Sequence, residues 1–110
     1  MQAERVLGHW PGMAIFKILR GPEWELLRAD GVFAGSADDL RDGFIHLSTE
    51  AQLEGTLAKH FAGEQGLVIV RVALEADPAL RWEASRGGDL FPHLYRPLRS
   101  ADVVEVLGNG

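Results

Sequence analysis

The chain has 110 residues, of which 46% are hydrophobic and 25% charged, a composition typical of one globular domain with its own core. It contains no cysteine, which excludes disulfides, thiolate catalysis and cysteine-ligated metal. The formal net charge of -5 argues against duplex nucleic acid as the main partner, because phosphate binding requires clustered cations. No apolar run approaches the roughly 20 residues of a membrane span, and the N-terminus lacks a signal-peptide core. We therefore expect a cytoplasmic protein that does not enter membranes.

The first half of the chain predicts a tail, a strand, a helix and a loop, in that order. Residues 1–13 have no period and are interrupted by Gly and Pro, so we expect a tail before a single domain over 14–110. An apolar strand is predicted over 14–19. A Gly-Pro start and a Gly stop then delimit a helix over 21–30. The polar, acidic segment 35–43 is rich in turn formers and is predicted to be a loop.

The second half predicts several strands around one helix. Thr49 and Gln52 fit a capping box, and apolar residues at helical spacing extend this helix to Gly63. Arg71 interrupts the most apolar strand, where we expect it to pair with an acid or to snorkel. Pro92 places its strand at a sheet edge or in an irregular stretch, because proline donates no ladder hydrogen bond. The predicted strands span 44–48, 67–74, 81–84, 90–95 and 103–107.

These elements predict the fold class. Strands run around two main helices, and the connections are too short for repeated parallel crossovers. We therefore expect an α+β domain with a mixed, mainly antiparallel β-sheet.

Two stretches frame a histidine in nearly the same way: Phe-Ile-His-Leu-Ser over 44–48 and Phe-Pro-His-Leu-Tyr over 91–95. In an extended backbone, alternate side chains share a face, so each frame places an aromatic ring, the imidazole and a hydroxyl together. We expect His46 and His93 to face a common pocket, where an imidazole can act as acid, base or ligand. The alternative for each is an imidazole that is hydrogen-bonded inside the core.

Other chemistries have weaker sequence signals. His46, His93 and a carboxylate such as Asp42 or Glu83 could hold a divalent metal, but no H-x-H or H-E-x-x-H spacing is present. Ser48 lacks the G-x-S-x-G turn of a hydrolase nucleophile, and Gly-rich phosphate loops are absent. Glu83 could orient the imidazole of His93, although we favour a solvated glutamate.

Positive charge is concentrated in one segment. Residues 81–99 carry four arginines and two acids, which gives +2 and leaves -7 for the rest of the chain. This distribution favours a small anionic ligand near His93. Arg86 or Arg96 could contact its phosphate, because a guanidinium forks onto phosphate oxygens. Ordinary solvated arginines are the alternative.

The motifs D-G-F-I-H-L-S over 42–48 and F-P-H-L-Y over 91–95, together with Lys17, Trp24 and Trp82-Glu83, resemble a known family. It is a family of small, mostly bacterial proteins known as a domain of unknown function, number nine hundred and fifty-two in its series. The resemblance covers residues 14–107. The family in turn resembles the ADP-ribosyltransferase superfamily, which implies a split β-sheet, NAD as cofactor and transferase activity.

The resemblance also implies roles for individual residues. His46 and Ser48 match the H-x-S/T motif that holds a ribose hydroxyl and the nicotinamide end, although Leu47 replaces the usual glycine. No late glutamate matches the transferase pattern unambiguously. The other readings are a non-catalytic module that binds a small anion or metabolite, and a divalent-metal hydrolase. We expect no metal, catalytic roles for His46, His93 and Tyr95, and ligand contacts from His46, Ser48, Phe44, Arg86 and Arg96.

Overall fold

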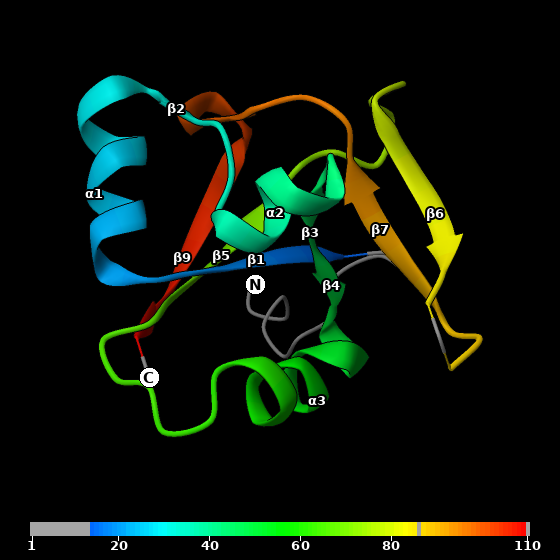
Figure 1. Ribbon diagram of the computed structural model, residues 1–110. Helices are drawn as coiled ribbons and strands as arrows, with labels where there is room; N and C mark the ends of the chain where they lie inside the picture. The colour runs from blue at the N-terminus through cyan, green and yellow to red at the C-terminus, as the bar shows by residue number, and fades with distance from the viewer. Residues whose placement is uncertain (1–13, 86, 110) are drawn as a thin grey trace, which may run out of the picture.

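The computed structural model describes residues 14–85 and 87–109 (Figure 1). Its helices are α1 (Gly21–Asp30), α2 (Ala37–Asp42) and α3 (Glu50–His60), with a short 3-10 turn, η1 (Ser100–Asp102). Its strands are β1 (Ile15–Leu19), β2 (Val32–Phe33), β3 (Ile45–His46), β4 (Ser48–Thr49), β5 (Val68–Val72), β6 (Leu80–Ala84), β7 (Leu90–Leu94), β8 (Leu98–Arg99) and β9 (Val103–Asn109).

The described strands form three sheets in which every pair is antiparallel. The largest has the order β4-β1-β5-β9, the second the order β3-β7-β6, and β2 pairs with β8. This arrangement confirms the predicted α+β class with split, antiparallel sheets. The predicted tail over 1–13 lies outside the described residues.

The core lies against one face of the largest sheet. Alternate residues of β5, namely Val68, Val70 and Val72, are buried on this face. Leu27 of α1 and Leu94 of β7 belong to the same buried cluster. Full burial of such a side chain stabilises the fold by about 1.5–3 kcal/mol. The core therefore joins the helix and both larger sheets into one unit.

The helix over 21–30 forms as predicted, and Gly31 ends it with a φ of 77° that suits glycine. The loop predicted over 35–43 is wrong, because α2 forms there. Ser36 Oγ accepts a hydrogen bond from Asp39 N at 3.1 Å, and Asp39 Oδ2 accepts one from Ser36 N at 2.9 Å. This capping box satisfies the helix start, so residues that also favour turns adopt a short helix.

The strand predicted over 44–48 divides between two sheets. β3 pairs with β7, whereas β4 pairs with β1. Leu47 stands between them with its side chain buried. The capping box of Thr49 and Gln52 is confirmed at the start of α3. This helix ends at His60, before the predicted stop at Gly63, and Phe61 is its C-cap.

Pro92 lies in the middle strand of its sheet, so the first of the two predicted places, a sheet edge, is wrong, whereas the second, an irregular stretch, is what the ladder shows. β7 runs between β3 and β6, and Pro92 pairs with Trp82 of β6. On its other side, β3 pairs only with His93 and Leu94. The missing N–H is therefore accommodated where the ladder with β3 ends, and the proline side chain is fully buried.

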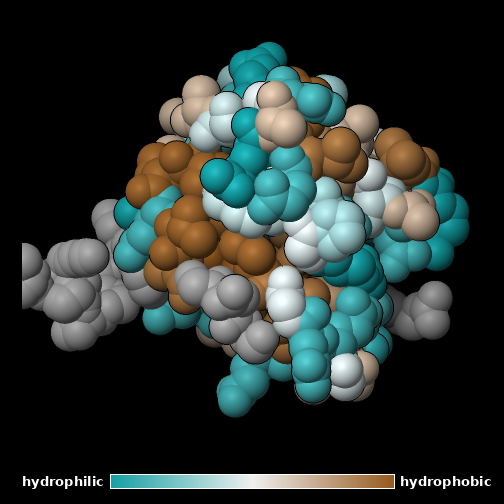
Figure 2. Space-filling view, turned by 90° about the vertical axis from the view of Figure 1, so that its left-hand side faces the viewer, coloured by the Kyte–Doolittle hydropathy of each residue, from teal (hydrophilic) through white to brown (hydrophobic). Residues whose placement is uncertain are grey.

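Apolar side chains are also exposed away from the core. Val104, Val106 and Leu107 on β9 and Leu26 on α1 are among the large hydrophobic residues with substantial exposure. Figure 2 looks onto the side of the molecule that lies to the left in Figure 1, where α1 is found, and apolar side chains gather on it. None of these four residues lines the cleft described below. Within the described part of the chain, no helix is long and apolar enough to cross a membrane.

Candidate functional site

The strand register brings the two histidines together. His46 of β3 is the direct partner of His93 of β7, and their ring centroids lie 5.8 Å apart. Directly paired residues of an antiparallel sheet project from the same face, which explains the proximity of the rings. The two frames recognised in the sequence therefore meet at one place, as predicted.

Both imidazoles line a cleft of about 600 Å³. α2 and the β3–β4 segment form one part of its wall, and α3 and the start of β7 form another. This volume lies within the range of about 300–1,000 Å³ that is usual for small-molecule sites. Besides the imidazoles, its lining includes the polar side chains of Lys17, Asp39, Asp42, Ser48, Gln52, Thr56 and Lys59.

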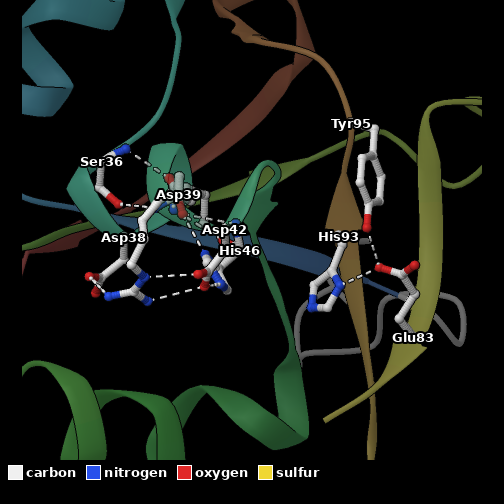
Figure 3. A network of polar contacts seen from close by, with 10 residues as sticks. Ser36, Asp38, Asp39, Asp42, His46, Glu83, His93 and Tyr95 are labelled. Carbon is white, nitrogen blue, oxygen red and sulfur yellow. Dashed lines mark hydrogen bonds and ion pairs between the residues drawn. The ribbon is translucent and has the colours of Figure 1, made fainter.

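His46 is held between two carboxylates (Figure 3). Its Nδ1 lies 2.6 Å from Asp39 Oδ1, and its Nε2 lies 3.0 Å from Asp42 Oδ2. Its backbone N–H also donates to Asp39 Oδ1 at 3.1 Å. A carboxylate only accepts, so both ring contacts are hydrogen bonds when each ring nitrogen carries a proton. In that state the ring has no free lone pair for a base or a metal ligand.

A buried lysine, Lys17, contacts both Asp39 and the backbone of His46. Lys17 Nζ donates to Asp39 Oδ2 and to the backbone oxygen of His46, each at 3.0 Å. Lys17 and Asp39 are only 5% and 2% exposed. Burial alone raises the pKa of Asp39, but the hydrogen bond from His46 and the charge of Lys17 outweigh it and hold that pKa well below its usual range. Asp39 is therefore a carboxylate that fixes the ring of His46.

His93 is oriented by a different acid. Its Nδ1 lies 2.7 Å from Glu83 Oε1, and the hydroxyl of Tyr95 donates to the same oxygen at 2.7 Å (Figure 3). The hydrogen bonds from Tyr95 and His93 lower the pKa of Glu83, so this carboxylate accepts both of them. Nδ1 of His93 is then the donor, and in the neutral ring Nε2 carries a lone pair. Among the described residues, Nε2 has no hydrogen-bond partner.

Glu83 remains partly exposed, as expected of a solvated glutamate, but it also orients His93, which is the alternative that the sequence offered. Phe44 completes the setting, because its ring stacks on that of His93 with centroids 3.9 Å apart and an interplanar angle of 20°. Tyr95 contacts Phe44 at 5.4 Å between ring centroids. Phe44 and Tyr95 thus support the imidazole without lining the cleft themselves.

Ser48 lies in the cleft wall with its hydroxyl already in use. Its Oγ is 3.1 Å from Thr56 Oγ1, and the residue is buried. This contact ties β4 to the middle of α3. Gln52, one turn earlier on the helix, accepts from Thr49 N and donates through Nε2 to the backbone oxygen of Leu90 at 2.8 Å. The Ser48–Thr56 and Gln52–Leu90 contacts therefore hold α3 against β4 and against β7.

The structure does not bring Arg96 to the cleft. Its guanidinium contacts Asp77 Oδ2 at 2.8 Å and Asp102 Oδ2 at 3.0 Å, and it is absent from the cleft lining. These two carboxylates occupy the guanidinium N–H donors of Arg96 that we expected to contact a phosphate. Arg86 lies outside the described residues. Arg71 pairs with Glu105 of the neighbouring strand at 3.1 Å, as one of the two sequence interpretations held.

Asp39 is the main site residue that the sequence reasoning missed. The spacing Ser-x-x-Asp over 36–39 is a helix-start signal and could have located α2. It could not have shown that the same carboxylate reaches His46, because that contact depends on the packing of α2 against β3. No cluster of three or more His, Asp or Glu residues that could hold a metal occurs within 14–85 and 87–109.

The fold and the cleft define a class of small α+β protein with a polar cleft at the junction of two antiparallel sheets. Residues 18–106 match the family described as protein of unknown function (DUF952), and the chain belongs to this family. The family resemblance predicted from the two histidine motifs is thereby confirmed. The likeness to ADP-ribosyltransferases is not among these findings.

Solved structures of a bacterial protein have the same fold. The crystal structure of CC0527 from Caulobacter crescentus is 49% identical, with a TM-score of 0.82 over 87% of this chain and 84% of that chain. The solution NMR structure of CC0527 is 52% identical, with a TM-score of 0.74 over 84% of this chain and 81% of that chain. No curated protein matches the sequence.

Proposed function

We propose that the cleft binds a small ligand with ribosyl and phosphate groups, of the NAD type, and that His93 moves a proton on it in a transferase reaction. The observation that carries this proposal is the pair of imidazoles 5.8 Å apart, which have different hydrogen-bond partners. Groups of one type in contrasting environments are a recurrent sign of divided acid and base roles. His46 is engaged on both nitrogens, whereas Nε2 of His93 is free among the described residues.

The His46–Asp42 pair suits the hydroxyls of a ribose. It presents an N–H donor and a carboxylate acceptor 3.0 Å apart at the cleft wall, and Asp42 is partly exposed. A ribose hydroxyl can donate to this carboxylate, which has about four acceptor sites and uses three of them for His46 and Arg41. The hydrogen bond from Arg41 lowers the pKa of Asp42, which keeps it an acceptor. His46 and Asp42 would therefore bind and orient the sugar.

His93 suits a proton-transfer role. Glu83 holds Nδ1–H, so the Nε2 lone pair is available to a hydroxyl or water in the cleft. NAD, when bound, supplies a ribosyl carbon whose bond to nicotinamide can be broken. His93 would take the proton of the group that attacks this carbon, and Glu83 and Tyr95 would hold the ring in place. The cleft volume of about 600 Å³ fits a ligand of this class.

Titration of the protein with NAD, ADP-ribose and nicotinamide, followed by backbone amide shifts in NMR, tests the binding step. We expect saturable shifts in segments 46–48, 52–59 and 91–93, and none around Arg96. The absence of any shift near His46 at millimolar ligand would refute the proposal. The variant Glu75→Gln, at an exposed position outside the cleft lining, should bind as the wild type does.

Release of free nicotinamide from NAD, measured by chromatography, tests the chemical step. We expect His93→Gln to keep the amide shifts near His46 but to lose at least about tenfold in the rate of release, since general base catalysis contributes on the order of 10²–10⁴. A wild-type protein that binds NAD without releasing nicotinamide, even with an added acceptor alcohol, would instead support a non-catalytic binding module. That second reading is favoured by one observation, the engagement of both nitrogens of His46, which leaves only one imidazole of the His46–His93 pair for catalysis.

A further inference from the structure

The charged side chains that line the cleft are nearly all paired with one another or with a neighbour. Lys17 pairs with Asp39, and Arg20 pairs with Glu64. Arg41 pairs with both Asp38 and Asp42. Of the lysine, arginine and aspartate side chains in the lining, Lys59 and Asp89 alone have no ion-pair partner among the described residues. These two are the charges that a ligand can meet without displacing an existing partner.

Lys59 and Asp89 lie toward opposite ends of α3. Gln52 donates to the backbone oxygen of Leu90, which places Asp89 beside the first half of the helix. Lys59 follows Gln52 by seven residues on the same face, so it lies about 10 Å further along the axis at 1.5 Å per residue. The negative and the positive charge are therefore separated along the length of the cleft.

The helix leaves open space between these two charges. Gly55 lines the cleft midway between Gln52 and Lys59, and a Cβ built on it meets nothing within 4 Å. A glycine inside a helix costs about 1 kcal/mol relative to alanine. The ligand can therefore lie close to the backbone of α3 at this point.

The end near Asp89 also offers an aromatic ring. Phe91 lines the cleft, and it shares a face of β7 with His93 because the two are alternate residues of one strand. A positively charged ring can stack on Phe91 and face the carboxylate of Asp89. At the other end, His60 lines the cleft beside Lys59 and can donate to the same anion.

We propose that the cleft selects a dipolar nucleotide, with its phosphate at Lys59 and a cationic aromatic ring at Asp89 and Phe91. This inference rests on the proposed function and adds the orientation of the ligand and its charge requirement. Oxidised nicotinamide nucleotides carry both charges, with a ribose between them for His46 and Asp42. Complementary charges in a cleft raise the local concentration of such a ligand and fix its direction.

Three probes separate the two charges. NAD carries the cationic ring and the phosphates, ADP-ribose lacks the ring, and nicotinamide riboside lacks the phosphates. We expect Lys59→Gln to weaken NAD and ADP-ribose by about three- to fivefold, as for an exposed ion pair, and to leave nicotinamide riboside unchanged. Asp89→Asn should weaken NAD and nicotinamide riboside to the same degree and leave ADP-ribose unchanged. Isothermal titration calorimetry at low salt measures all nine affinities, those of the wild type and of both variants for the three probes.

Glu54→Gln is the matched control, since Glu54 is an exposed charge on α3 outside the cleft lining, and its affinities should equal those of the wild type. If NAD binds but each variant changes all three affinities equally, the proposed orientation is wrong while the proposed function stands. If the wild type binds none of the three probes at millimolar concentration, both proposals fail. A reversed pattern, in which Lys59→Gln affects nicotinamide riboside alone, also overturns the orientation.

Discussion

At the scale of single residues, the two histidine frames are alike in sequence and different in chemistry. His46 meets two carboxylates from α2, and His93 meets one carboxylate from β6. The number of acceptors around a ring sets how many of its nitrogens can donate. Equal motifs therefore give one imidazole suited to positioning and one suited to proton transfer.

Tyr95 gives a direct measure of the Glu83 contact. The chain has a single tyrosine, so the absorbance of phenolate reports this residue alone. The hydrogen bond to Glu83, together with its negative charge, raises the pKa of Tyr95 above its ordinary value of 10.0. We expect a spectrophotometric titration midpoint above 10.0 in the wild type and a lower midpoint in Glu83→Ala. Glu75→Ala should leave the midpoint where it is; equal midpoints in all three proteins would contradict the contact.

Asp39 should govern part of the acid sensitivity. Its pKa is depressed in the folded protein, so the unfolded chain, with an ordinary value near 3.8, takes up the proton first as the pH falls. The stability that the carboxylate contributes is therefore present above about pH 5 and is lost progressively below it. Urea denaturation between pH 5 and pH 3 should show a steeper loss in the wild type than in Asp39→Asn. Parallel curves would show that Asp39 titrates normally.

The same substitution should also be costly near neutral pH. Asp39→Asn leaves Lys17 buried without its carboxylate, and an uncompensated buried charge costs about 3 kcal/mol or more in the free energy of unfolding. Lys17→Met with Asp39→Asn removes both charges and should recover part of this loss. The double variant would still lack the carboxylate that fixes His46.

At the scale of elements, the site depends on short segments whose ends are fixed. α2 has six residues and ends at Asp42, and β3 and β4 have two residues each. Such pieces are not stable alone, so the capping box of α2 and the pairing of β3 and β4 with longer strands hold them. The division of 44–48 between two sheets places His46 on one sheet and Ser48 on the other, and the cleft opens at this junction.

Gly55 tests the role of α3. Gly55→Ala should raise the free energy of unfolding by about 0.5–1 kcal/mol, because alanine favours the helix and its Cβ meets no neighbour within 4 Å. The same methyl group lies in the cleft, so NAD should bind more weakly despite the gain in stability. Thermal denaturation and calorimetry measure the two effects. A more stable protein with unchanged affinity would show that the ligand does not lie along α3.

At the scale of the whole molecule, Arg96 joins parts of the chain that are distant from the site. It contacts Asp77, in the connection between β5 and β6, and Asp102, in the turn before β9. The two hydrogen-bonded carboxylates hold the pKa of Arg96 above its ordinary value, so its charge is constant. The contacts of Arg96 with Asp77 and Asp102 therefore stabilise the β9 edge of the largest sheet and its connection to the sheet that carries His93.

Arg96→Met should separate stability from binding. We expect a loss of about 2 kcal/mol in the free energy of unfolding, since hydrogen bonds to charged groups contribute on the order of 1.5–3 kcal/mol. The affinity for NAD should not change. Arg28→Met, which removes an exposed pair with Glu25, should cost no more than about 0.5 kcal/mol. A loss of NAD affinity in Arg96→Met without a loss of stability would show that Arg96 contacts the ligand after all.

Much of the fold can be predicted from local patterns of the sequence. The Gly-Pro start and Gly31 stop of α1, the Thr49 capping box and the apolar run of β5 all predict elements that the structure contains. The two histidine frames also identified the family and the place of the cleft. These features depend on residues close together in the chain, where spacing alone decides the conformation.

Only the tertiary structure decided which partner each polar group has. Lys17 binds Asp39, which is 22 positions further along the chain, and Glu83 accepts a hydrogen bond from His93. Arg96 binds Asp77 and does not line the cleft. Burial forces groups such as Lys17 and Asp39 to pair. Which groups meet depends on how α2, β6 and η1 pack, and no local spacing encodes that. The sequence by itself determined where two imidazoles would stand, and the packing of acids around them determined what each can do.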